Sequence, residues 1–284
     1  MTKQLMVLVA AVVLLLINSI FIEPNVLDVV KYEIEDSFLQ GAKVVYVSDF
    51  HLKRGDYNRL DRIVKKINEQ KPNIVLLGGD FATGKSLDKT MNPEIMAQKL
   101  SLLDAPTYAV LGENDWKVGG NKITDALLGV GIRVLDNSNV RIILNRRYLD
   151  IVGLADYSSR AVKIGQAMRR TVLPRIVFTH SPDVYYDIAD DVTIILAGHT
   201  HGGQFAIPFV GPFFVQSKYG TELASGLIQK TNNKMIVSKG LGTTAIPIRF
   251  NCKPEITLVQ FVQPNMYGDY EEQKQPRQKK KIKF

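Results

Sequence analysis

The feature that most constrains the fold of this 284-residue chain is a series of short apolar runs, most of them four or five residues long and rich in valine and isoleucine. Runs of this length, closed by polar residues or glycine, are typical of buried β-strands. They predict strands over residues 43–47, 74–77, 108–111, 142–144, 150–153, 176–179, 193–197, 235–238 and 256–259.

Two stretches between the first of these runs have the spacing of amphipathic helices. Within residues 58–70 the apolar side chains recur at intervals of three and four, and Pro72 follows the end of the pattern. Residues 93–103 have the same character. The alternation of strands and helices predicts an α/β domain with right-handed crossovers. Long helices are missing between the later runs, which predicts that the sheet system ends in antiparallel strands.

The amino-terminal segment is strongly apolar. Residues 5–22 are apolar except for Asn18 and Ser19, a length that just allows a helix to cross about 30 Å of hydrocarbon. A cleaved secretory signal has a similar pattern, but no run of small residues suited to cleavage follows. The sequence therefore favours an uncleaved single-pass anchor at the bacterial inner membrane. Because lysines lie on both sides of the segment, the side of the membrane on which the domain lies stays open.

These patterns divide the chain into an anchor or signal helix over residues 1–22, a linker over 23–40, a folded domain over 41–263 and a basic tail over 264–284. The net charge is +8, but six basic residues lie in the last eleven positions. Such a tail is either solvated and disordered or attracted to anionic lipid headgroups. In the rest of the chain the positive and negative charges nearly balance, which excludes a nucleic-acid-binding face. The single cysteine, Cys252, excludes an internal disulfide and a cysteine-based zinc site.

Side chains that can ligate a metal follow several of the predicted strands directly. In open α/β sheets, functional groups gather beyond the carboxyl ends of the strands, so these side chains are expected to meet. On an extended backbone, two residues at positions i and i+2 point to the same side, and two such pairs occur here. The side chains are Asp49, His51, Asp80, Glu113, His180, His199 and His201, which include all four histidines of the chain.

Imidazoles and carboxylates without a thiolate suit Mn, Fe or Zn. A single histidine of this kind is more often a hydrogen-bonded structural residue. Four histidines, each beside glycine, aspartate or proline at a strand end, favour a metal site.

The order of these motifs resembles the calcineurin-like metallophosphoesterase superfamily, and in particular its membrane-anchored or secreted bacterial branch. The motifs are D-x-H at 49–51, G-G-D at 78–80, G-x-x-D at 112–115, H-x-P-D at 180–183 and G-H-T-H-G-G-Q at 198–204. The resemblance spans about residues 43–261. It implies an α/β fold, the four-layer αββα sandwich of two mixed sheets flanked by helices.

The resemblance also implies two divalent metal ions that are bridged by one carboxylate and activate a bridging hydroxide for attack at phosphorus. By position, Asp49, His51, Asp80 and His201 would hold one ion, and Asp80, Glu113, His180 and His199 would hold the other.

The sequence departs from the family where the usual block G-N-H-D reads Gly112-Glu113-Asn114-Asp115. Aligned without a gap, Glu113 replaces the amide ligand, and Asn114 replaces the histidine that stabilises or protonates the leaving group. An alternative alignment with one inserted residue makes Asn114 the ligand and puts Asp115 in place of the histidine. Asn114 and Asp115 are therefore the predicted catalytic residues. Glu113 makes the site less positive by one charge than the usual amide ligand would. Such a site would also suit one trivalent iron ion in place of the two divalent ions.

Asn114 can donate a hydrogen bond but cannot deliver a proton. The missing proton donor slows the departure of an alkoxide more than that of a phosphomonoester, because the second pKa of a phosphomonoester is about 6. We therefore expect a diphosphate linkage to be cleaved better than an alkyl phosphodiester. Arg54 and Arg249 are candidate substrate-binding residues, because a guanidinium can meet a phosphate with two parallel hydrogen bonds.

The predicted function is that of a metal-dependent phosphohydrolase that acts on a phosphodiester or diphosphate bond of a lipid-linked or nucleotide-linked substrate. The branch that the chain resembles includes enzymes that cleave UDP-2,3-diacylglucosamine during lipid A synthesis. The expected partners are a phosphorylated small molecule or lipid and the membrane, without nucleic acid. The alternative is a weakened or inactive relative that binds a phosphorylated ligand or serves as a scaffold, an interpretation that Asn114 motivates.

Overall fold

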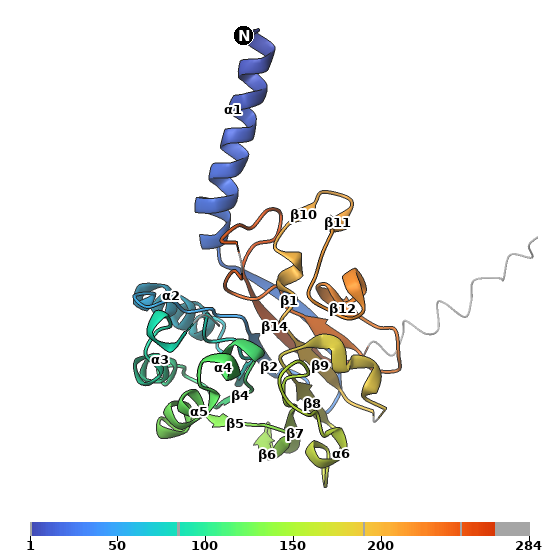
Figure 1. Ribbon diagram of the computed structural model, residues 1–284. Helices are drawn as coiled ribbons and strands as arrows, with labels where there is room; N and C mark the ends of the chain where they lie inside the picture. Colours follow the sequence, from blue (N-terminus) through green and yellow to red (C-terminus); the bar gives the residue numbers. More distant parts are fainter. Residues whose placement is uncertain (1, 84–85, 190, 245, 265–284) are drawn as a thin grey trace, which may run out of the picture.

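The computed structural model describes residues 2–83, 86–189, 191–244 and 246–264. Two six-stranded sheets face each other, and helices cover their outer faces (Figure 1). The apolar core between the sheets includes Tyr46 and Leu76 from one sheet and Phe178 and Leu196 from the other. The predicted α/β sandwich of two mixed sheets flanked by helices is thus confirmed.

The first sheet has the strand order β1-β14-β2-β3-β4-β5. The strands β2 to β5 are parallel, whereas β14 is antiparallel to β2 and parallel to β1. Their bounds are β1 (Asp28–Glu35), β2 (Lys43–Val47), β3 (Ile74–Leu77), β4 (Thr107–Ala109), β5 (Arg133–Val134) and β14 (Glu255–Val262).

The second sheet has the strand order β12-β13-β9-β8-β7-β6. Its bounds are β6 (Ser138–Leu144), β7 (Arg147–Gly153), β8 (Arg175–Phe178), β9 (Ile194–Ala197), β12 (Gly226–Ile228) and β13 (Met235–Val237). We expected antiparallel strands in this part, but β7, β8, β9 and β13 are parallel and only the edge strands β6 and β12 are antiparallel. Long helices are not needed for these crossovers, because short ones cover this face: α6 (Ile164–Ala167), η4 (Pro182–Asp187) and η6 (Gly220–Leu223).

Longer helices cover the outer face of the first sheet. Helix α2 (Tyr57–Asn68) buries the predicted apolar stripe of Leu60, Ile63, Val64 and Ile67. The same core includes side chains of α3 (Pro93–Leu100) and α5 (Gly120–Gly129). Helix α4 (Glu113–Val118) begins directly beyond β4, and the short helix η3 (Leu87–Lys89) follows β3.

The expected linker over residues 23–40 is not a linker in the structure. Strand β1 occupies its middle and pairs in parallel with the whole length of β14. Ile34 is buried against the core between the sheets. The alternating exposure along β1 shows why the run analysis missed this strand: as an edge strand it buries few side chains and so carries no continuous apolar run.

The amino-terminal helix projects away from the sandwich (Figure 1). Helix α1 (Lys3–Ile17) continues through a π-helical turn, η1 (Asn18–Ile22), and a short turn, η2 (Glu23–Asn25). The segment Lys3–Asn25 is long and apolar enough to cross a membrane. The side chains of α1 are exposed along its whole length, which distinguishes it from the core helices of the domain. The predicted basic tail, apart from residue 264, lies outside the described residues.

Candidate metal centre

The seven predicted ligand residues follow strands of both sheets. Asp49 and His51 lie beyond β2, Asp80 beyond β3, and Glu113 at the start of α4 beyond β4, and the other three histidines lie beyond β8 and β9. Because the two sheets face each other, all seven residues lie at one edge of the sandwich. The structure therefore brings together every residue that we predicted as a metal ligand.

The backbone of these loops is tightly turned. Five of the seven residues have φ angles in the left-handed region, between 44° and 71°: Asp49, His51, Asp80, His199 and His201. We expected an extended backbone for the two i, i+2 pairs, and this was wrong. A left-handed conformation costs a non-glycine residue about 1–2 kcal/mol, so strain at so many positions in one site is typical of a functional constraint.

One group of ligand atoms consists of Asp49, His51 and His201, all buried and within 4.8 Å of one another. The Nε2 atoms of His51 and His201 are 3.0 Å apart, and Asp49 Oδ1 lies 3.4 Å from His201 Nε2. These three side chains converge on one point, as ligands of a single cation would.

A second group consists of Glu113, His180 and His199, again within 4.8 Å. Glu113 Oε2 lies 3.0 Å from His180 Nε2 and 3.1 Å from His199 Nδ1. The carboxylate of Glu113 thus occupies a ligand position, which agrees with the alignment that has no gap.

Asp80 lies between the two groups. Its Oδ2 atom is 3.6 Å from His51 Nε2 in the first group and 3.5 Å from His180 Nε2 in the second. Asp80 also forms a cluster of its own with Asp49 and His180. A carboxylate in this position can bind a cation on either side.

The donor set fits cations. His51 Nδ1 and His180 Nδ1 lie 3.1 Å and 2.8 Å from the carbonyl oxygens of Ala82 and Gly78. Because a carbonyl only accepts, each Nδ1 carries the proton and each Nε2 keeps a lone pair directed into the site. Among the described residues, Asp49 Oδ1 and Glu113 Oε2 are buried and have no hydrogen-bond donor. Buried carboxylate oxygens without donors are costly, and bound cations would satisfy them.

The electrostatics also favour positive charge in the site. Burial raises the pKa of Asp80, and the neighbouring carboxylate of Glu113 adds to this effect. Burial alone would lower the pKa of His180, but the carboxylates of Asp80 and Glu113 outweigh it and raise that pKa. Burial, together with His201, lowers the pKa of His51 to about 3, so this imidazole is neutral and able to ligate at neutral pH.

Two glycines leave room for the carboxylates. A Cβ atom on Gly112 would lie 2.2 Å from Asp80 Oδ1, and one on Gly240 would lie 2.6 Å from the Cβ atom of Asp49. Neither contact is sterically possible, so both positions require glycine for the close approach.

The two predicted catalytic residues have different surroundings. The side-chain amide of Asn114 donates to Asp80 Oδ2 at 2.5 Å, and its backbone N–H donates to Asp80 Oδ1 at 2.9 Å. Asp115 is fully buried and accepts hydrogen bonds from the backbone N–H groups of Ala82 and Gly112. Asp115 therefore ties two loops together, and its complete burial counts against the predicted catalytic role.

The two predicted substrate-binding arginines do not lie together. Arg249 is fully buried, and its guanidinium donates to the carbonyl oxygens of Lys239, Gly240, Gly242 and Cys252. It has no exposed surface for a substrate, which counts against the predicted substrate-binding role. Arg54 is exposed and lines a shallow surface cleft with Thr83 and Lys89.

Residues that position the ligands were missed in the sequence. The Ser48 hydroxyl donates to Asp49 Oδ2 at 2.5 Å, and the backbone N–H of His199 donates to the same oxygen at 3.0 Å. These contacts fix the Asp49 carboxylate so that its Oδ1 atom faces the site. The place of Ser48 directly before Asp49 was the available signal.

Comparisons with known proteins show the family of the chain. Residues 42–203 match the profile of the family Calcineurin-like phosphoesterase. The chain is 34% identical over 230 residues to phosphodiesterase YaeI of Escherichia coli strain K12, covering 78% of this chain and 82% of the relative. It is 28% identical over 268 residues to the uncharacterized metallophosphoesterase YkuE of Bacillus subtilis strain 168, covering 86% and 89%. A solved structure, TT1561 of Thermus thermophilus, aligns with a TM-score of 0.47 at 12% identity, over 71% of this chain and 91% of that one.

Proposed function

Because this chain belongs to the calcineurin-like phosphoesterase family and is a metal-dependent phosphoesterase, we propose that it hydrolyses phosphodiester or diphosphate bonds with a pair of divalent cations. Asp49, His51 and His201 hold one cation, and Glu113, His180 and His199 hold the other. Asp80 is shared between them. The observation that carries this proposal is the place of Asp80 Oδ2, 3.6 Å from an imidazole nitrogen of one group and 3.5 Å from one of the other.

The bound cations, Mn, Fe or Zn, would polarise the phosphoryl oxygens and lower the pKa of a water molecule that attacks phosphorus. The protein orients the ligands for this chemistry. Ser48 and the backbone of His199 hold Asp49, and Asn114 holds Asp80. Glu113 adds a negative charge where the family usually has an amide, which makes the site a weaker attractor of phosphate.

Asn114 cannot protonate the leaving group, and every histidine of the chain belongs to a ligand group. The substrate must therefore release a group that leaves without a proton from the enzyme. A diphosphate linkage releases a phosphomonoester, whose second pKa is about 6, whereas an alkyl diester releases an alkoxide. We therefore favour a diphosphate-linked substrate.

We further infer that the apolar segment Lys3–Asn25 is a single-pass anchor in the bacterial inner membrane. An anchored enzyme suits a lipid-linked substrate. UDP-2,3-diacylglucosamine, an intermediate of lipid A synthesis, combines a diphosphate linkage with acyl chains and represents this class.

The test compares the turnover of three substrates by the full chain in detergent: UDP-2,3-diacylglucosamine, a dialkyl phosphodiester and an alkyl phosphomonoester. We expect the diphosphate to react fastest and a chelator to abolish turnover until metal is restored. The leaving-group argument fails if the dialkyl ester reacts faster. Turnover of all three that is insensitive to the chelator would refute metal catalysis. Absence of turnover in the metal-loaded protein would favour a ligand-binding or scaffold role.

A further inference from the structure

The foot of the amino-terminal helix, which comprises η1 and η2 (residues 18–25), is held against the domain next to the metal centre. The backbone N–H of Arg249 donates to the carbonyl oxygen of Ser19 at 2.9 Å, and the N–H of Cys252 donates to the buried carboxylate of Glu23. Cys252 in turn contacts the carbonyl oxygen of His201, at 3.2 Å from its Sγ atom. A membrane that holds α1 would therefore face a defined end of the domain.

The metal centre opens at that end. His51 lines a cleft together with Ile20 and Pro24 from the foot of α1. His199 and His201 line a second cleft, whose other walls come from the segment that follows them and from Thr244, Ile246 and Ile248. Both openings thus lie beside the point where α1 leaves the sandwich.

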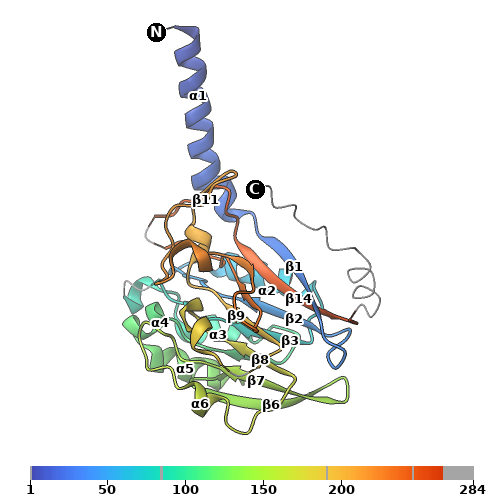
Figure 2. The same cartoon turned by 90° about the vertical axis from the view of Figure 1, so that its right-hand side faces the viewer.

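A hairpin at this end exposes large apolar side chains. It is formed by β10 (Ala206–Ile207) and β11 (Gly211–Pro212), and it lies beside the foot of α1 in both Figure 1 and Figure 2. Phe209 is fully exposed, and Val210, Phe213 and Phe214 are 71%, 71% and 77% exposed. Burial of one such side chain contributes about 1.5–3 kcal/mol. Exposure of four of them to water is therefore costly, whereas their insertion into a lipid interface is favourable.

The second cleft joins this hairpin to the metal ligands. It has a volume of about 440 Å³, within the range of ligand sites. Its apolar walls are formed by Phe205, Phe214, Val215, Ile246 and Ile248, and its inner end by His199 and His201. An apolar chain in this cleft would have its phosphorylated end at the metal centre.

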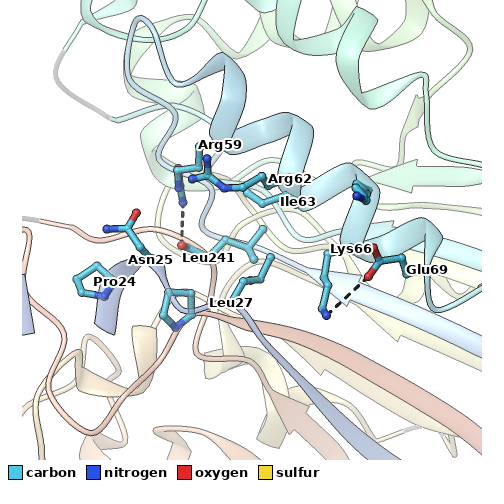
Figure 3. Close-up of a pocket in the computed structure, with 11 residues that line it drawn as sticks. Pro24, Asn25, Leu27, Arg59, Arg62, Ile63, Lys66, Glu69 and Leu241 are labelled. Atoms are coloured by element: carbon cyan, nitrogen blue, oxygen red, sulfur yellow. Dashed lines mark hydrogen bonds and ion pairs between the residues drawn. The ribbon is translucent and has the colours of Figure 1, made fainter. Parts of the chain in front are cut away.

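The other side of the foot of α1 carries positive charge. Figure 3 shows a cleft between Pro24 and Asn25, at this foot, and Arg59 and Arg62 of α2. Lys65 and Lys66 continue this basic lining along the helix. Basic side chains near a membrane surface attract anionic headgroups, by about 1 kcal/mol each.

We propose that the hairpin residues Phe209, Val210, Phe213 and Phe214 insert into the bilayer beside α1, and that a phosphorylated membrane lipid reaches the metal centre through the apolar cleft. This inference rests on the proposed function for the identity of the reacting group. The insertion of the hairpin does not depend on that chemistry and can be tested separately.

The membrane contact is tested with the full chain in vesicles of phosphatidylethanolamine and phosphatidylglycerol. A Phe209→Cys variant carries an environment-sensitive fluorophore, and Tyr148→Cys, exposed on β7 at the opposite end of the domain, is the matched control. The native Cys252 is buried and contributes little labelling. We expect quencher lipids to reduce the emission at position 209 several-fold more than at position 148. Equal quenching at the two positions would overturn the insertion.

The apolar cleft is tested by competition. Phosphatidic acids with two hexanoyl or two octanoyl chains compete with hydrolysis of bis(p-nitrophenyl) phosphate, and inorganic phosphate serves as the reference ligand. We expect the longer chains to inhibit at least tenfold more tightly, and Ile246→Ser to remove this difference while inhibition by inorganic phosphate is unchanged. Equal inhibition by both lipids would overturn the lipid route. If the wild-type chain did not hydrolyse bis(p-nitrophenyl) phosphate at all, the proposed function would be refuted. The quenching experiment would still show whether the hairpin inserts into the bilayer.

Discussion

Asn114 illustrates how one residue can take a different role at a position where the family has a histidine. At the position of a proton donor in the family, it instead holds the carboxylate of Asp80 through a 2.5 Å hydrogen bond. Because Asp80 lies between the two ligand groups, this contact positions the oxygen that both groups share. Asn114 is therefore a positioning residue for the ligand.

We predict that Asn114→Ala lowers turnover of a diphosphate and of a dialkyl phosphodiester by the same factor, about 10- to 100-fold, the usual effect of losing a residue that orients a metal ligand. The measurement is kcat for both substrates, and Lys117→Ala, which removes an exposed neighbour of Asn114, is the control with little change. A loss at least tenfold larger for the dialkyl ester would contradict this role, since only a group that assists departure depends on the leaving group.

The sequence predicted which residues would gather beyond the strand ends, but not the contacts of the polar residues around them. The ligands are short polar side chains at strand ends, where parallel topology leaves few other places for them. Asp115 and Arg249 carry the same kinds of charge, yet their partners are backbone groups of the surrounding loops, such as the N–H of Ala82 for Asp115 and the carbonyl oxygen of Cys252 for Arg249. Hydrogen bonds of this kind depend on how the loops pack, and a residue pattern does not record them.

At the scale of elements, the buried Arg249 and the partly exposed Arg59 hold the loops that surround the metal centre. Arg249 joins the carbonyl oxygens of Lys239, Gly240 and Gly242 to that of Cys252. Arg59 of α2 donates to the carbonyl oxygens of Phe50 and Leu241 at 2.8 Å and 2.7 Å. Together they connect the loop beyond β2, which carries Asp49 and His51, to the loop that follows β13.

We predict that Arg249→Lys destabilises the folded domain by at least about 2 kcal/mol, because a lysine cannot reproduce the planar fork and leaves buried carbonyl groups without a donor. Denaturant unfolding of the full chain in detergent measures this change. Arg54→Lys, at an exposed position, should stay within about 0.5 kcal/mol of the wild type. If Arg249→Lys raised only KM and left stability unchanged, a substrate-binding role would be correct instead.

The strands were predictable because burial on both faces gives a continuous apolar run. The two main helices were predictable because burial of one stripe gives apolar residues at intervals of three and four. Strand β1 was not, since its alternating exposure resembles a polar linker and its partner β14 lies more than 200 residues away in the sequence. The parallel direction of the later strands was missed for a related reason. Their crossovers use short helices and loops that have no amphipathic pattern.

At the scale of the whole molecule, the sandwich places three features at one end. The loops of both sheets meet there to form the metal centre, α1 leaves the domain there, and the apolar hairpin lies beside it (Figure 2). The sequence shows the apolar amino-terminal segment and the ligand motifs separately, but not the hairpin, and the common location of all three depends on the way the two sheets face each other. This arrangement suits the hydrolysis that we propose, of a substrate held in a membrane.

The most direct test of the central claim is the metal content of the purified full chain after dialysis against the metal-free buffer. Two complete ligand groups that share Asp80 predict about two cations per chain. Asp80→Ala should retain at most about one and lose turnover, because the shared ligand supports both positions. A wild-type chain that binds no cation, or an Asp80→Ala chain that keeps both cations and full turnover, would contradict the proposed metal pair.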